Sequence, residues 1–136
     1  MALFVWDEIY RVGISTIDEQ HQRLFDIVNR FHDAVVRREG RWALVSAFDE
    51  LAEYTAYHFR DEEQRMAEVG YPDLARHRGY HEKLVDLVIT YRAQLAAGAD
   101  GIEARALDFI KMWLNAHVLG TDKEIGRYVV ERRIGK

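Results

Sequence analysis

The sequence of 136 residues contains no cysteine, a single proline and no long run of apolar residues. The lack of cysteine excludes disulfides, thiolate zinc sites, iron–sulfur clusters and cysteine nucleophiles. No stretch approaches the roughly 20 apolar residues that cross a membrane, so membrane insertion is not expected. The first residues, Met1 to Asp7, lack the basic start and apolar run of a signal peptide. We therefore expect a cytoplasmic protein.

A basic surface is missing as well. Lysine and arginine total 19 against 23 aspartates and glutamates, which gives a formal charge of −4. Nucleic acids and anionic lipids attract basic faces, so we expect neither as a partner. The apolar share of 49% is that of a globular chain, and the length fits one domain over residues 1–136.

The spacing of the apolar residues predicts an all-α chain. Apolar positions recur at alternating steps of three and four, and no segment shows the period of two that strands require. Short gaps favour an antiparallel up-down-up-down four-helix bundle, with an irregular N-terminal segment and a short C-terminal fifth helix. The predicted helices span residues 18–38, 42–67, 73–97, 102–118 and 122–133.

Residues that begin or end helices support these limits. Asp18 is expected to cap the first helix, and Gly70 to end the second. Pro72 suits the first turn of the third helix. Gly120 is expected to break the chain after the fourth helix, and Thr121-Asp122-Lys123-Glu124 has the pattern of a capping box that begins the fifth.

Polar side chains interrupt the apolar seam near the starts of the first and third predicted helices and the ends of the second and fourth, which meet at one end of an antiparallel bundle. Five of the six histidines are in phase with the apolar residues, and His32, off the seam, is expected at the surface or its boundary. Burying so many unpartnered imidazoles with a carboxylate is unfavourable, so the seam requires a bound partner. Pairs four residues apart share one helix face, which suits a metal. The candidate ligands are His21, His58, Glu62, His77, His81, His117 and Asp122.

The number and type of these groups suit two metal ions such as iron. Two octahedral ions need about twelve bonds, and five imidazoles, two bridging carboxylates and one bridging water oxygen provide about eleven. One position is left for a small exogenous ligand. Carboxylate-rich di-iron enzymes of helical bundles use paired Glu-x-x-His motifs, which this sequence lacks. A less anionic set favours binding dioxygen over cleaving it.

The arrangement of these residues resembles the hemerythrin family, closest to its bacterial single-domain form. The resemblance covers nearly the whole chain. It rests on Trp6, Asp18-x-Gln20-His21, His58-Phe59-x-x-Glu62, Tyr71-Pro72, His77-x-x-x-His81 and Trp113-Leu114-x-x-His117-x-x-x-x-Asp122.

The resemblance implies a non-haem di-iron centre with an oxo or hydroxo bridge. By that resemblance, dioxygen binds reversibly as hydroperoxide on one iron. One iron would be held by His77, His81 and His117, the other by His21 and His58, with Glu62 and Asp122 bridging both. The apolar ligand pocket implied by the family consists of Leu24, Phe59, Trp113, Leu114 and Val118.

The expected function is that of an oxygen carrier, store or local supplier, and not of an enzyme. Nitric oxide or a small anion would take the same open position as dioxygen. The alternatives are a sensor of oxygen, nitric oxide or redox state that works through a partner, a di-iron peroxidase or oxidase, and simple metal storage. The sequence identifies no protein partner.

Overall fold

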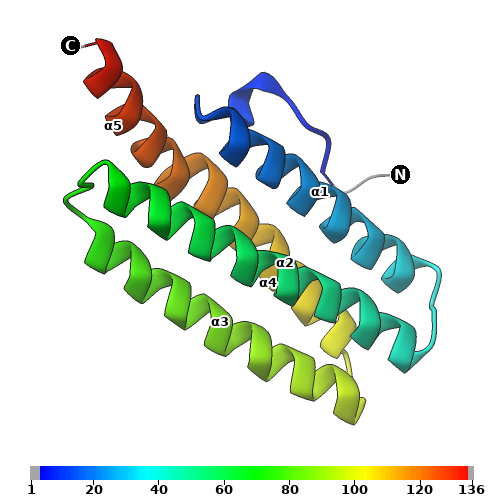
Figure 1. Cartoon of the computed structure of the whole chain (residues 1–136). Coiled ribbons are helices and arrows are strands. Elements are labelled where there is room, and N and C mark those ends of the chain that lie inside the picture. The colour runs from blue at the N-terminus through cyan, green and yellow to red at the C-terminus, as the bar shows by residue number, and fades with distance from the viewer. Residues whose placement is uncertain (1–3, 135–136) are drawn as a thin grey trace.

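Four long helices form the body of the protein, and the computed structural model describes residues 4–134 (Figure 1). In the described residues there is no strand. A 3-10 helix, η1, and a π-helix, η2, supplement the α-helices. The elements are η1 (Glu8–Tyr10), α1 (Ser15–Val36), α2 (Arg41–Glu68), α3 (Leu74–Ala97), α4 (Ile102–Ala116), η2 (His117–Asp122) and α5 (Lys123–Ile134).

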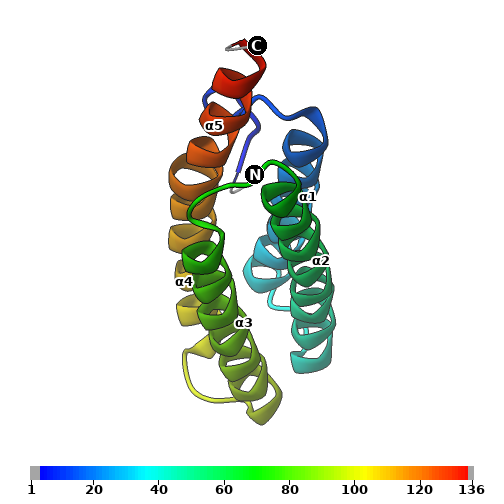
Figure 2. The same ribbon diagram turned by 60° about the vertical axis from the view of Figure 1, so that its left-hand side comes forward.

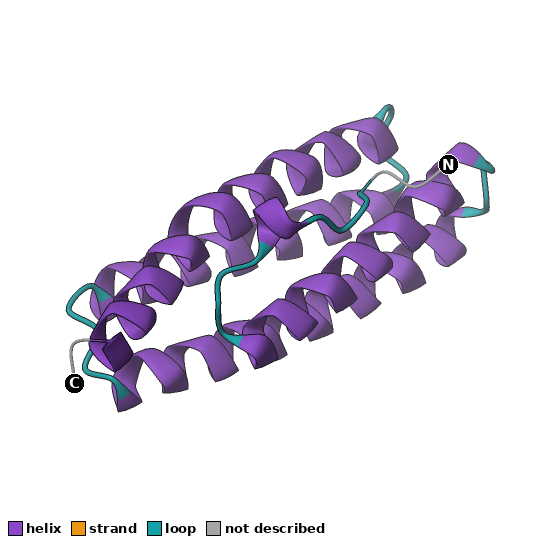
Figure 3. Ribbon diagram, turned by 90° about the horizontal axis from the view of Figure 1, so that it is seen from above, coloured by secondary structure: helices purple, strands orange, loops and turns teal. Residues whose placement is uncertain are grey.

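The helices run alternately up and down, so the predicted antiparallel bundle is confirmed (Figure 2). α2 lies between α1 and α3 and contacts both. α5 continues the line of α4 and extends past the ends of its neighbours (Figure 1). The segment before α1 crosses the bundle as a loop that carries η1 (Figure 3). The predicted irregular N-terminal segment and short fifth helix are therefore both present.

Three predictions about helix ends are wrong. α1 begins one turn before Asp18, whose carboxylate instead accepts the backbone N–H of Val12 at 2.8 Å. Pro72 lies before α3, which begins at Leu74. Gly120 does not break the chain, because the backbone continues from α4 into α5 through η2. α5 begins at Lys123, inside the Thr121-Asp122-Lys123-Glu124 pattern, but it continues η2 instead of starting after a break, and the side chain of Thr121 lies outside the described part.

The end of α2 follows the sequence-based prediction. Gly70 adopts a left-handed φ of 65°, which the turn requires and glycine tolerates. The backbone N–H of Tyr71 donates to the carbonyl of Met66 at 2.8 Å, and that of Gly70 donates to Ala67 at 3.2 Å. These two hydrogen bonds form a Schellman motif, which satisfies carbonyl groups that have no partner within the helix and turns the chain toward α3.

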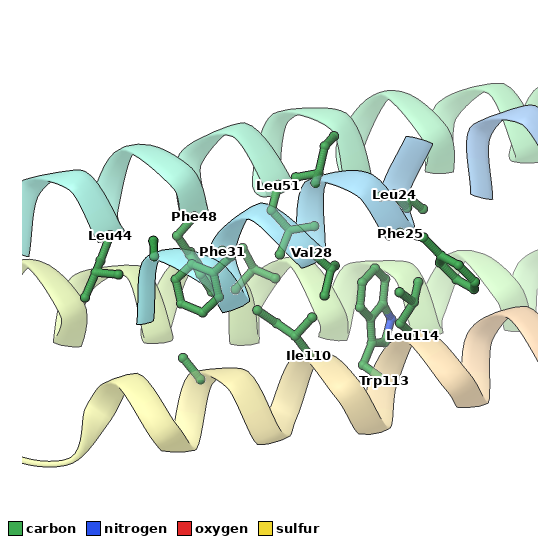
Figure 4. Packing of buried hydrophobic residues seen from close by; sticks show 14 of the residues in the cluster. Leu24, Phe25, Val28, Phe31, Leu44, Phe48, Leu51, Ile110, Trp113 and Leu114 are labelled. Carbon is green, nitrogen blue, oxygen red and sulfur yellow. The ribbon is translucent and has the colours of Figure 1, made fainter. Parts of the chain in front are cut away.

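The apolar core has two parts. The larger fills the bundle between α1, α2 and α4, with Phe31 and Phe48 in edge-to-face contact at 5.5 Å (Figure 4). The smaller lies where α5 meets the start of α1 and the end of α2, around Ile17, Met66 and Ile125. The polar seam residues lie between these two apolar regions.

Candidate metal centre

The structure places all seven candidate ligands inside the same end of the bundle. α1 supplies one, α2 two, α3 two and η2 two, and each is at most 4% exposed. Ligand atoms of five of them lie within 4.8 Å of one another, a spacing that suits metal binding. These five are His21, His58, Glu62, His117 and Asp122.

Asp122 and His58 are at the middle of this group. Asp122 Oδ2 lies 2.5 Å from His21 Nε2, 2.8 Å from His117 Nε2 and 3.4 Å from His58 Nε2. His58 Nε2 lies 3.0 Å from Glu62 Oε2 and 3.2 Å from His117 Nε2. Imidazole nitrogens from three helical segments therefore converge on two carboxylates.

α3 closes the centre on the other side. His81 Nε2 lies 3.4 Å from Glu62 Oε1, so the two oxygens of Glu62 face different histidines. His77, one turn earlier, is buried and packs its ring against Tyr71 at 5.3 Å. Neither ring nitrogen of His77 has a hydrogen-bond partner among the described residues. His77 and His81 are outside the tightest group of five, but His81 borders Glu62, and the charges of Glu62 and Asp122 act on His77.

The π-helix explains how Asp122 reaches the centre. In a regular α-helix, residues five apart differ by roughly 140° around the axis, so Asp122 would point away from the face of His117. In η2 the wider i→i+5 turn brings residues five apart onto one face. A break at Gly120, predicted from the sequence, would have brought Asp122 back to the centre in another way. The widened turn achieves the same result without interrupting the helix.

Burial and charge act against each other in this centre. Burial lowers the pKa of His21 and of His77. Burial alone would also lower the pKa of His58, but Glu62 and Asp122 outweigh it and raise the pKa to about 10. Burial would raise the pKa of Asp122, yet His117 and His21 hold it well below its usual range. Asp122 is thus ionised and attracts positive charge, either protons on imidazole or metal cations.

The donor set fits two metal ions. Among the described residues, seven of the ten buried side-chain nitrogen and oxygen atoms that lack a well-oriented hydrogen-bond partner belong to this centre. Unpartnered buried polar atoms are unfavourable unless a ligand satisfies them. Imidazole with carboxylate and no sulfur suits a borderline divalent ion such as iron. These seven atoms are His21 Nδ1, both oxygens of Glu62, both nitrogens of His77, His81 Nε2 and Asp122 Oδ1.

Hydrogen bonds outside the centre orient His58. Its Nδ1–H donates to the side-chain oxygen of Gln20 at 2.7 Å. The Gln20 amide donates to Asp61 at 2.8 Å, and Arg65 Nε donates to the same Asp61 oxygen at 2.9 Å. A proton fixed on Nδ1 leaves Nε2 as the ligand atom that faces inward.

A shorter chain of contacts orients His81. Its Nδ1–H donates to Glu63 Oε2 at 2.9 Å, and Arg78 Nε donates to the other Glu63 oxygen at 3.1 Å. The ligand set predicted from the sequence includes neither Asp61 nor Glu63 and gives Gln20 no orienting role. The sequence shows that Asp61 and Glu63 flank the candidate ligand Glu62, but which helices they face follows only from the arrangement of the bundle.

Aromatic rings cover the imidazoles on the side of the bundle interior. The ring of Phe59 stacks on His81 at 3.9 Å with an angle of 1°, and Trp113 stacks on His117 at 5.7 Å. Leu24, Leu114 and Val118 are fully buried in the larger apolar cluster, where Figure 4 shows Leu24 and Leu114. The five predicted pocket residues are thus all buried, and two are stacked on candidate ligands.

Comparison with known proteins identifies the family. The family model for the hemerythrin HHE cation binding domain matches residues 12–129. The chain belongs to the hemerythrin family. Bacteriohemerythrin of Stenotrophomonas maltophilia (strain R551-3) is 37% identical over 123 residues, which cover 90% of this chain and 79% of that protein. Bacteriohemerythrin of Methylococcus capsulatus (strain Bath) is 32% identical, covering 93% and 96%.

Solved hemerythrin structures share the fold. The crystal structure of a wild-type hemerythrin superimposes with a TM-score of 0.84 at 31% identity, covering 93% of this chain and 97% of that one. The hemerythrin bundle is therefore reproduced in this chain. None of the helices within residues 4–134 combines the length and the hydropathy that crossing a membrane requires.

Proposed function

We propose that the chain is a di-iron protein that binds dioxygen reversibly, as an oxygen carrier, store or local supplier and not as an enzyme. The observation that carries this proposal is the set of nitrogen and oxygen atoms that gather in one buried centre without a well-oriented hydrogen-bond partner among the described residues. The bacteriohemerythrin relatives support iron as the metal. Residues 1–136 are taken as a single hemerythrin-like domain.

The contacts of the two carboxylates support a division of the ligands between two ions. Glu62 lies 3.0 Å from His58 on one side and 3.4 Å from His81 on the other, the arrangement expected of a bridging ligand. Asp122 likewise borders histidines of α1, α2 and η2. One iron would take His77, His81 and His117, the other His21 and His58, and both would share Glu62 and Asp122.

Two ferrous ions held in this centre would supply two electrons to one dioxygen molecule. The surrounding residues protect the bound ligand from water and protons. Leu24, Leu114 and Val118 offer no acidic proton and exclude water, and the stacked Phe59 and Trp113 hold two imidazoles in place. A dry apolar wall slows the proton-assisted loss that would leave the irons oxidised. Nitric oxide and small anions are proposed as competing ligands of the same position.

The test is iron analysis combined with an absorption spectrum. The apo protein is loaded with Fe²⁺ under argon, exposed to oxygen and then degassed. We expect two irons per chain and a visible charge-transfer band that appears with oxygen and disappears on degassing. A band that never reverses, or steady consumption of a reductant at enzyme-like rates, would contradict an oxygen-binding role.

Replacing Glu62 with alanine tests the proposed bridge. We expect Glu62→Ala to hold fewer than two irons per chain, because both metal positions lose a ligand. Glu53→Ala is the matched control, since Glu53 is an exposed glutamate of the same helix. Full loading of Glu62→Ala would refute the bridging role.

A further inference from the structure

A cavity of about 140 Å³ lies behind the metal centre, between the start of α1, the end of α2 and α5. Its walls are mostly apolar. This volume has room for several water molecules, since one needs at least about 10–15 Å³. We name it the α5 cavity, and its apolar wall consists of Ile14, Ile17, Val69, Ile125 and Val129.

The inner end of the α5 cavity is formed by Glu62 and Asp122. Both carboxylates are 1% exposed, and both carry oxygen atoms without a well-oriented hydrogen-bond partner among the described residues. None of the five histidines of the centre lines this cavity. It is therefore separate from the space between the imidazoles and reaches the centre only at its two anionic ligands.

The charges around the α5 cavity favour a cation. Glu68 lines it in addition to the two buried carboxylates, and the one cationic side chain among its described lining residues is Arg65. Arg65 Nε is paired with Asp61 at 2.9 Å, which offsets its charge. Low-dielectric walls around a negative end focus the field and raise the local concentration of cations. The apolar wall offers no ligand at which an ion would stop before the carboxylates.

A larger groove between α3 and α4 has the opposite character. It measures about 480 Å³ and reaches His81 and His117. Arg76 and Lys83 line it together with one acid, Glu124, and the excess of positive charge opposes the approach of a cation. Because this groove ends on imidazoles and not on carboxylates, it offers a divalent ion a weaker first contact.

We propose that the α5 cavity is the route by which divalent cations reach the centre of the folded apo protein, with Glu62 and Asp122 as their first ligands. The proposal rests on the proposed function, since it presumes a metal centre. An ion that enters here passes apolar walls that offer no ligand, and it exchanges part of its water for two carboxylates at the inner end. The imidazoles then complete its coordination.

The test measures the rate of metal uptake, with Co²⁺ as the probe. Folded apo protein, checked by circular dichroism, is mixed with Co²⁺, and the visible absorption of the bound ion is followed in time. The phenyl ring of Val129→Phe fills part of the α5 cavity, so metal uptake then requires a local opening of the fold. We expect uptake to slow by about tenfold or more with unchanged final stoichiometry. Leu87→Trp, which fills the α3–α4 groove instead, is the matched control and should load at the wild-type rate.

A surface variant keeps the test independent of packing. Glu68→Lys reverses an exposed charge at the α5 cavity without filling it. We expect uptake to slow by at least about threefold at low salt, and the difference from wild type to shrink as salt is added.

The outcomes separate this route from the function itself. A wild-type chain that binds no Co²⁺ would refute the metal centre altogether. If all variants load two ions at the wild-type rate, or if Leu87→Trp slows uptake as much as Val129→Phe, only the route is wrong. If Val129→Phe slows oxygen binding by the loaded protein but leaves Co²⁺ uptake unchanged, the cavity conducts gas and the proposal is overturned.

Discussion

Glu63 provides the sharpest test of how the protein tunes its metal centre. It accepts the Nδ1–H of His81 at 2.9 Å and is held by Arg78 at 3.1 Å. Glu63→Gln keeps an acceptor of the same size at this position but removes its charge. His81 then loses a partner that makes its Nε2 more basic, so its metal is bound less tightly.

The size of the effect follows from the hydrogen bond. A bond to a charged group contributes about 1.5–3 kcal/mol and a neutral one about 0.5–1.5 kcal/mol. The difference, about 1–1.5 kcal/mol, corresponds to roughly a tenfold loss of metal affinity. That value lies at the lower end of the roughly 10–100-fold range typical for hydrogen-bond partners of metal-binding histidines, in keeping with a change that removes only the charge.

The measurement is a competition titration of apo protein with Co²⁺ against a chromophoric chelator. Glu82→Gln is the matched control, because Glu82 is an exposed acid next to His81 on α3. It removes an equal charge and leaves the hydrogen bond from His81 to Glu63 intact. Equal affinities in the two variants would show that general charge, and not the bond to His81, sets the affinity. An unchanged metal affinity in Glu63→Gln would show that the charge of Glu63 does not strengthen metal binding by His81.

Three further predictions concern the pocket and the packing. Leu114→Ser should shorten the half-life of the oxygenated form, because a buried hydroxyl admits water; an unchanged decay of the visible band would contradict the pocket assignment. Phe31→Ala should lower the free energy of unfolding of the apo protein in urea by about 3–5 kcal/mol without changing metal stoichiometry, since Phe31 is fully buried away from the centre. Gly126→Ala should lower the free energy of unfolding by about 1–3 kcal/mol, because the added methyl group would lie 1.9 Å from the carbonyl oxygen of Val12. Gly79→Ala is the control: its methyl group would contact no other atom, so the variant should be neutral or stabilising in the same assay.

Most of the bundle could be predicted because its signals are local. The apolar steps of three and four set the helices, and the observed ends lie within about one turn of the predicted ones. The prediction for the end of α2 was correct because Gly70 supplies a left-handed turn that few other residues tolerate. The prediction for the start of α1 was wrong because the carboxylate of Asp18 accepts the backbone N–H of Val12 instead of capping the helix. A cytoplasmic location stays a prediction that the structure does not test.

The candidate ligands could be predicted because burial of a polar group is itself informative. His58 and Glu62, four apart on an apolar seam, already require a partner inside the bundle. His32, off the seam, is half-buried, as expected. The route of Asp122 to the centre was not predictable, because a glycine followed by a capping-box pattern usually marks a break. A π turn at this point leaves no distinct residue pattern.

The acidic run Asp61-Glu62-Glu63 shows why outer contacts escape sequence analysis. Successive helix residues differ by about 100°, so three neighbours necessarily point in three directions. Here they point to Gln20 on α1, into the centre, and to His81 on α3. Which helices lie on either side of α2 depends on the handedness of the bundle, and the apolar seam is the same for either hand. The central carboxylate is therefore visible from the sequence, whereas the partners of its two neighbours become visible only when α1 and α3 are in place.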